Sequence, residues 1–244
     1  KGVILDIRLP GIDGMAVLTA IKENIHTRHI PVHIVSVNEH RTESLRRGAV
    51  GHEVKPLDND QFDSVLARLA AVTGERSKRV LVVEDDARQR ADTVQLISTD
   101  DVTVDEAANG ASAMAKLRQN CYDCIVLDLN LPDFSGKELL QRLEDEGVTL
   151  PPVILHTAYQ FSSMEEAELR AHSDSIVVKD VRSPERLLDE VSLFLHRVVS
   201  DMPERQRKII HGLHDGDAVL RNRKVLIVDD DMRTTFALSK MLTE

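Results

Sequence analysis

The chain has 244 residues, of which 42% are apolar and 30% charged, and its formal net charge is −10 at pH 7. This is the composition of a globular protein of one or two domains. The excess of acid disfavours nucleic-acid binding, because attraction to phosphates needs a basic face. No apolar run approaches the roughly 18 residues of a membrane span. We therefore expect a cytoplasmic chain with no nucleic-acid partner and no membrane contact of its own, and leave open an anchor upstream in a longer parent.

The first part of the chain, 1–74, alternates apolar runs with amphipathic segments. The predicted strands are 3–6, 32–36 and 51–54, and a helix is predicted at 58–72. These elements correspond to the second half of the longer pattern that follows them. We therefore interpret 1–74 as the C-terminal half of a first unit, from its strand three to its helix five.

The middle of the chain, 79–199, alternates strands and helices five times. The predicted strands are 79–83, 102–106, 123–127, 152–156 and 175–178. The predicted helices are 86–100, 111–119, 135–146, 162–172 and 183–199, with Ser183 as the N-cap of the last. Continuous apolar strands are typical of a sheet covered on both faces. Alternating βα units predict an α/β fold of the flavodoxin-like type, a doubly wound (βα)5 parallel sheet with strand order 2-1-3-4-5.

The end of the chain combines a polar segment with a second repeat. Residues 200–223 are interpreted as a linker with one amphipathic turn around Ile209, Ile210 and Leu213. The run Lys-Val-Leu-Ile-Val-Asp-Asp-Asp at 224–231 repeats the pattern at 79–86. It predicts that 224–244 is the start of a third unit, with strand one and helix one.

A longer motif also occurs twice and locates the chemistry. Leu5-Asp6-Ile7-Arg8-Leu9-Pro10 continues to Gly14, and Leu127-Asp128-Leu129-Asn130-Leu131-Pro132 continues to Gly136. Each copy is an apolar strand, an Asp at its end and a Pro/Gly turn. Carboxyl ends of parallel strands are where open α/β sheets bind their ligands. A repeat of this period indicates tandem domains rather than a solenoid.

Polar side chains follow four strands of the central unit at the point where each strand ends. They are Glu84, Asp85 and Asp86, then Asp128, Thr157 and Lys179. In the predicted strand order these ends converge on one pocket. Neighbouring carboxylates repel by about 4 kcal/mol per pair at an effective dielectric near 20, so the cluster needs a cation. Oxygen ligands without His or Cys favour Mg²⁺. Asp86 is expected to cap the following helix rather than to bind metal.

These residues together resemble the receiver domain of two-component response regulators. The resemblance rests on Glu84/Asp85, Asp128, the Leu131-Pro132…Gly136 turn, Thr157 and Lys179, in that order and spacing. It extends over 1–74, 79–199 and 224–244. Tandem receivers with short linkers are similar to the multi-receiver C-terminal part of a hybrid sensor histidine kinase. No kinase ATP-binding module is found in these residues, so the chain would catalyse only its own phosphorylation and dephosphorylation.

The resemblance implies a role for each residue of the central pocket. Asp128 is expected to take a phosphoryl group from a phosphohistidine and to form an aspartyl phosphate. The expected Mg²⁺ ligands are Glu84 (through water), Asp85, Asp128 and the backbone carbonyl of Asn130. Lys179 would neutralise phosphoryl oxygens, and Thr157 would hydrogen-bond one of them after transfer. Expected partners are a phosphohistidine-bearing kinase or phosphotransfer domain in a phosphorelay and the neighbouring receiver units, with a homodimer left open.

The flanking units carry parts of the same pattern. The counterparts of Asp128, Thr157 and Lys179 in the first unit are Asp6, Ser36 and Lys55. That unit lacks the acidic pair, whereas Asp229 and Asp230 supply one in the third unit. We hypothesise a composite site, formed if the strand at 224–228 lies beside the strand at 3–5 and so protects its open edge.

Two departures from the family pattern keep an alternative open. Asp180 follows Lys179 where the family usually has Pro, and Ile176 stands where an aromatic residue is common. They favour a non-phosphorylated pseudo-receiver that acts as an interaction scaffold. The intact set of pocket residues argues against this alternative. A haloacid-dehalogenase-like phosphatase is disfavoured, because that family needs a second Asp two residues after the nucleophile, where Asn130 and Arg8 stand here.

Overall fold

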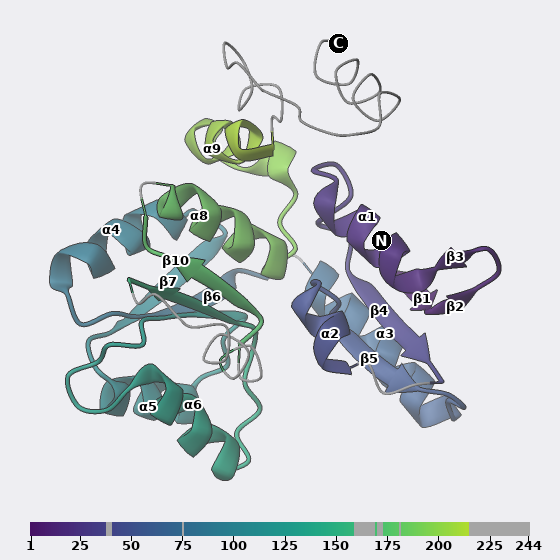
Figure 1. Cartoon of the computed structure of the whole chain (residues 1–244), viewed down its shortest axis with the longest axis horizontal. Helices are drawn as coiled ribbons and strands as arrows, with labels where there is room; N and C mark the ends of the chain where they lie inside the picture. Colours follow the sequence, from purple (N-terminus) through teal and green to yellow (C-terminus); the bar gives the residue numbers. More distant parts are fainter. Residues whose placement is uncertain (38–40, 75, 159–168, 170–172, 181, 215–244) are drawn as a thin grey trace, which may run out of the picture.

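The computed structural model describes residues 1–214 except 38–40, 75, 159–168, 170–172 and 181, and of 41 and 42 only the backbone. The described chain forms two parallel sheets with helices around them, in an N-terminal and a central unit (Figure 1). Most of the helix predicted at 162–172, and all of 224–244 with Asp229 and Asp230, lie outside the described residues. None of the described helices is both long and apolar enough to cross a membrane.

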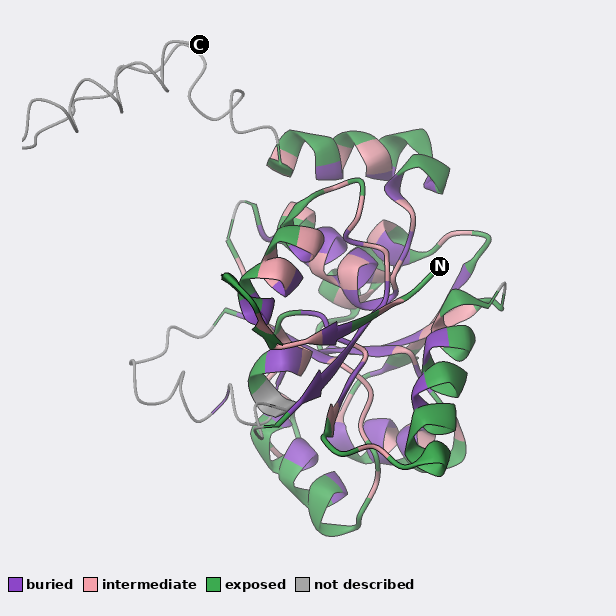
Figure 2. Ribbon diagram, turned by 90° about the vertical axis from the view of Figure 1, so that its right-hand side faces the viewer, coloured by how far each residue is buried: buried purple, intermediate pink, exposed green. Residues whose placement is uncertain are grey.

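The central unit has five parallel strands in the order β10-β9-β8-β6-β7. They are β6 (Lys78–Val83), β7 (Val102–Ala107), β8 (Cys124–Leu127), β9 (Val153–Thr157) and β10 (Ser175–Val178). The observed order is the predicted 2-1-3-4-5, so the flavodoxin-like α/β fold is confirmed. The three central strands β6, β8 and β9 are mainly buried (Figure 2), as their continuous apolar runs require, whereas the edge strands β7 and β10 are mostly half-buried or exposed.

Two helical layers cover this sheet. Helices α4 (Ala87–Ile97) and α8 (Ser183–Phe194) lie on one face, and α5 (Gly110–Gln119) and α6 (Gly136–Asp145) lie on the other (Figure 1). Each face has its own apolar cluster, one including Leu139 and Leu143 of α6 and the other Leu187 and Val191 of α8. The sheet thus presents its strand ends, rather than either face, to a ligand.

Helix ends follow the capping residues in most places. Asp86 caps α4 by accepting hydrogen bonds from the N–H groups of Arg88 and Gln89, which confirms its predicted role. The predicted cap of α8 was wrong: Ser183 is the first helical residue and no side chain caps that end. The predicted end at 199 was also wrong, because His196 adopts a left-handed backbone conformation with φ of 54° and stops the helix.

The N-terminal unit has a three-stranded parallel sheet in the order β1-β4-β5. Its strands are β1 (Val3–Asp6), β4 (Val32–Ser36) and β5 (Gly51–Val54), and its helices are α1 (Gly14–Glu23), α2 (Arg41–Arg46) and α3 (Asn59–Thr73). The strands lie where they were predicted. The Pro/Gly turn additionally forms a small antiparallel hairpin of β2 (Arg8–Leu9) and β3 (Ile12–Asp13).

The segment predicted as a linker contains a helix. After a 3-10 turn at Val199–Asp201, α9 spans Glu204–His214 and packs on α8 (Figure 1). Ile210 of α9 is fully buried, in an apolar cluster that also contains Met202 and Leu188 of α8. The amphipathic turn expected around Ile209 is therefore a complete helix, which is stabilised by packing of its apolar face rather than by composition.

Candidate functional site

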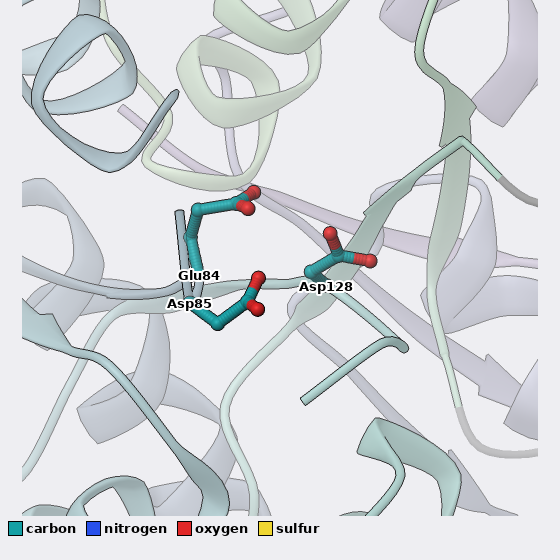
Figure 3. A group of neighbouring side chains, drawn as sticks. All are labelled: Glu84, Asp85 and Asp128. Carbon is teal, nitrogen blue, oxygen red and sulfur yellow. The ribbon is translucent and has the colours of Figure 1, made fainter. Parts of the chain in front are cut away.

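The central strand ends bring three acidic side chains together. Glu84 and Asp85 follow β6 and Asp128 follows the neighbouring β8, and their side chains approach one another in Figure 3. One oxygen of each lies within 4.8 Å of the others. Glu84 and Asp128 are only 4% and 6% exposed, whereas Asp85 is exposed. The predicted convergence of these carboxylates is thus observed, with one of them open to solvent.

Lys179 links the two buried carboxylates. Its amine donates hydrogen bonds to Asp128 Oδ2 at 2.6 Å and to Glu84 Oε2 at 2.7 Å. Burial raises the pKa of Glu84, and the hydrogen bond from Lys179 opposes that rise. Burial also disfavours the charged amine, but the hydrogen bonds to Asp128 and Glu84 outweigh it and raise the pKa of Lys179. The amine therefore stays protonated as the counter-ion of this pocket.

Backbone contacts hold the remaining predicted residues around Asp128. The N–H of Asn130 donates to Asp128 Oδ1 at 3.2 Å, so the loop after β8 folds back on the carboxylate. Thr157 is fully buried at the end of β9, and its carbonyl accepts from the N–H of Lys179 at 2.8 Å. Thr157 and Lys179 are thus placed side by side next to the acidic group.

The Gly that ends the repeated motif has a steric role. A Cβ at Gly136 would lie 2.6 Å from the carbonyl oxygen of Asp128, and one at Gly14 would lie 2.3 Å from that of Asp6. The N–H groups of these glycines donate to Leu129 and Ile7 respectively. Close approach of a helix start to the Asp loop therefore requires glycine in both units.

Arg90 contributes to the site and was missed from the sequence. Its guanidinium, on α4, donates to the carbonyl oxygens of Glu84 at 2.7 Å and Asp85 at 3.2 Å. It thereby fixes the backbone that carries the acidic pair. The only sequence signal for this role is an Arg one helical turn after the Asp86 cap. An Arg at that position is equally typical of a solvated helix face.

The N-terminal unit contains a partial copy of the pocket. Lys55 donates to Asp6 Oδ2 at 2.5 Å, and Ser36 is buried at the end of β4. The Asp6 and Lys55 side chains are 30% and 40% exposed. The hydrogen bond from Lys55, helped by the N–H of Arg8, lowers the pKa of Asp6. Within the described ranges, the acidic group close enough to hold a metal is the one in the central unit.

The central pocket fits a small divalent cation. Glu84 Oε1 is buried and has no hydrogen-bond partner, which leaves one carboxylate oxygen unsatisfied beside Asp85 and Asp128. The available ligands are carboxylate and carbonyl oxygens, which suit Mg²⁺ better than softer metals.

Comparison with known proteins identifies the family. Residues 2–67 and 80–192 match the response regulator receiver domain, so the chain belongs to this family. It is 32% identical over 119 residues to the transcriptional regulatory protein ResD of Bacillus subtilis (strain 168), covering 49% of this chain and 48% of that protein. It is 29% identical over 149 residues to SrrA of Staphylococcus aureus, covering 58% and 61%. The chain thus spans about half to three fifths of these curated relatives.

Solved receiver structures are also similar to about half of the chain. The response regulator protein TrrA of Thermotoga maritima, solved in complex with Mg(2+)-BeF, has 29% identity and a TM-score of 0.41. The match covers 48% of this chain and 98% of that one. A CheY-like receiver protein of Methanospirillum hungatei has 27% identity and a TM-score of 0.43, covering 51% and 98%. The chain carries receiver domain sequence of two-component signalling.

Proposed function

We propose that the central unit is a phosphoacceptor: it takes a phosphoryl group from a phosphohistidine onto Asp128 in a Mg²⁺-dependent reaction. The observation that supports this best is the buried Asp128 carboxylate, held at 2.6 Å by the Lys179 amine beside an unsatisfied oxygen of Glu84. Such a pocket has more carboxylates than the single Lys179 amine neutralises, and a divalent cation would balance the excess negative charge. It is poorly explained as a structural ion pair.

The chemistry is a displacement at phosphorus. One oxygen of Asp128 forms a bond to phosphorus while the bond to the donor imidazole nitrogen breaks, and the imidazole leaves with the bonding electron pair. Mg²⁺, when bound by Glu84, Asp85, Asp128 and the Asn130 carbonyl, supplies charge neutralisation. Lys179 keeps its proton and neutralises phosphoryl oxygens, and the Thr157 hydroxyl donates to one of them. Positioning and charge supply most of the catalysis.

The wider proposal rests on the two segments of the chain that match the receiver family. We place the chain in a multi-receiver protein, of which the C-terminal part of a hybrid sensor histidine kinase is the favoured example, because two receiver segments match in one chain. The proposed partners are a phosphohistidine-bearing kinase or phosphotransfer domain and the adjacent receiver units. Asp6, with Ser36 and Lys55, is proposed as a second acceptor only if acidic residues from elsewhere complete it. That the chain binds no nucleic acid stays a prediction.

The competing function is a pseudo-receiver scaffold. Ile176 on β10 replaces the aromatic residue common in the family and packs against the apolar cluster that contains Leu139 and Leu143 of α6, and Asp180 replaces the usual Pro. A scaffold would keep the fold and the inter-unit contacts but would not accept phosphate.

Intact mass distinguishes the two functions. The chain is incubated with acetyl phosphate, with and without Mg²⁺, alongside Asp128→Asn. A single Mg²⁺-dependent phosphoryl adduct that disappears in the variant supports the acceptor. Absence of both an adduct and Mg²⁺ binding supports the scaffold, and an adduct that survives in the variant points to Asp6.

A further inference from the structure

A buried ion pair joins the N-terminal unit to the central unit. Arg28, in the loop 24–30 between α1 and β4, is 3% exposed, and Asp189 on α8 is 8% exposed. The Arg28 guanidinium donates from Nη1 to Asp189 Oδ1 and from Nη2 to Oδ2 at 3.1 Å. A second bond from Nη2 reaches the Asp189 carbonyl at 3.4 Å. Such a paired contact uses the planar, forked guanidinium of Arg, and the single ammonium group of Lys does not reproduce it.

A third residue ties α9 to the same pair. His214, the last residue of α9, places Nε2 2.9 Å from Asp189 Oδ1 and 2.5 Å from Arg28 Nη1. One nitrogen cannot donate to Asp189 and accept from Arg28 at once, so the imidazole tautomer selects its partner. Burial opposes ionisation of Asp189, but hydrogen bonds from His214 and Arg28 outweigh it and lower its pKa. We call these three residues the Arg28 clasp.

The loop that carries Arg28 is held in shape from within the N-terminal unit. The buried Lys22 amine donates to the carbonyl oxygens of Arg28 at 3.1 Å and Ile30 at 2.8 Å. The Thr27 hydroxyl donates to the carbonyl of Ile21 at 2.8 Å. Arg28 is therefore presented to α8 by a preorganised loop rather than by a flexible one.

Apolar side chains accompany the clasp at this joint. In the cluster of Leu188, Met202 and Ile210, the N-terminal unit contributes Ile25 within the described residues. A buried ion pair fixes the geometry of a contact more than it adds to its free energy, because the cost of desolvating both charges offsets most of their attraction. Small polar interfaces between domains usually allow relative motion. The clasp thus fixes the geometry of the docking more than its strength, which suits a contact that opens and closes.

Helix α8 also connects the clasp with the proposed phosphorylation pocket. Lys179 directly follows β10, and α8 begins at Ser183, so Asp189 lies in the second turn of the helix after the pocket lysine. A phosphoryl group at Asp128 adds about −1.5 to −2 charge next to the amine that now bridges Asp128 and Glu84. A change in how Asp128 and Glu84 hold Lys179 would reach α8 through the short covalent connection between β10 and this helix.

We propose that the Arg28 clasp is an intrachain latch that docks the N-terminal unit and α9 on the outer face of α8 and loosens when Asp128 is phosphorylated. The coupling to Asp128 rests on the proposed function, whereas the docking itself does not. The latch makes the relative arrangement of consecutive receivers depend on the state of one of them.

Hydrogen exchange followed by mass spectrometry tests the coupling. The full chain is compared with and without acetyl phosphate and Mg²⁺, and intact mass of the same samples reports the adduct. We expect peptides covering 24–30 and 204–214 to exchange roughly fivefold faster or more after phosphorylation, the factor given by about 1 kcal/mol of lost protection. An adduct without faster exchange overturns the coupling and leaves the proposed function standing. Absence of an adduct refutes the proposed function and the coupling together.

Variants test the clasp without phosphorylation. Arg28→Gln should raise exchange in 24–30 and 204–214 while β6 and β8 stay protected. Arg47→Gln is the matched control, because Arg47 forms an exposed pair with Glu43 in the same unit. Unchanged exchange at 204–214 in Arg28→Gln overturns the latch. Should Arg28→Gln deprotect the whole N-terminal unit, Arg28→Lys decides: faster exchange at 204–214 with β4 protected supports the latch, and unchanged exchange there refutes it.

Discussion

Replacing Lys179 by Met removes the counter-ion of two buried carboxylates and keeps much of the side-chain volume. Glu84 and Asp128 are 4% and 6% exposed, and their oxygens lie within 4.8 Å of each other. At that separation two unit charges repel by about 3 kcal/mol at an effective dielectric of 20. Breaking a buried pair by removing one partner costs a similar amount, roughly 3 to 5 kcal/mol. We therefore expect the variant to lose about 3 kcal/mol of unfolding free energy at pH 8.

The loss should depend on pH in a defined direction. Burial already raises the pKa of Glu84, and Lys179 opposes it, so the pKa rises further in the variant. An acid whose pKa is raised by folding keeps its proton in the folded state at pH values where the unfolded chain has lost it. The unfolding free energy therefore falls as the pH rises from the ordinary pKa of 4.5 toward the raised pKa. The deficit relative to the natural chain should therefore be small near pH 5 and largest at pH 8.

Urea unfolding at pH 5 and pH 8, with and without Mg²⁺, measures this deficit. Mg²⁺ should stabilise the variant more than the natural chain, because it replaces the missing positive charge. Lys208→Met is the control, since Lys208 is in an exposed pair with Glu204 and should change stability by less than about 0.5 kcal/mol. A deficit that is equal at both pH values and unaffected by Mg²⁺ would refute the reasoning.

Two further substitutions probe the surroundings of Asp128. Gly136→Ala should slow phosphorylation about tenfold or more, because its Cβ would meet the Asp128 carbonyl at 2.6 Å and displace the acceptor. Gly212→Ala is the control, since the space around Gly212 is open and the rate should stay unchanged. Equal rates in the two variants would contradict the steric argument. Burial, then Lys179, lowers the pKa of His156 to about 4, so this side chain should contribute up to about 3 kcal/mol to the rise in unfolding free energy between pH 4 and 6.5. His156→Leu should reduce that rise in urea unfolding, and parallel curves for the variant and the natural chain would argue against a neutral His156 in the folded state.

The sequence was sufficient wherever one local pattern determines the structure. Apolar-rich runs placed β1, β4 and β10 at the observed residues, because a strand covered by helices tolerates few polar side chains. The strand order followed from alternating βα units, and the convergence of Glu84, Asp128 and Lys179 followed from that order. The pocket was therefore predictable as soon as the strand ends were located.

Features that depend on distant contacts were not predictable. Helix α9 lies in a segment whose composition resembles a linker, and it is fixed by Ile210 packing against α8. The end of α8 depends on the left-handed backbone of His196, a residue with no strong preference for it. The Arg28–Asp189 pair joins residues far apart in the chain, and neither residue stands out locally from a solvated surface charge.

The central claim is that Asp128 accepts the phosphoryl group, and chemical mapping of the modified residue tests it most directly. Borohydride reduces an aspartyl phosphate to homoserine, and peptide mass spectrometry then locates the homoserine in the chain. After incubation with acetyl phosphate and Mg²⁺, we predict homoserine at position 128, in the peptide that follows β8. Homoserine at position 6 alone, or no homoserine in a chain that binds Mg²⁺, would contradict the account.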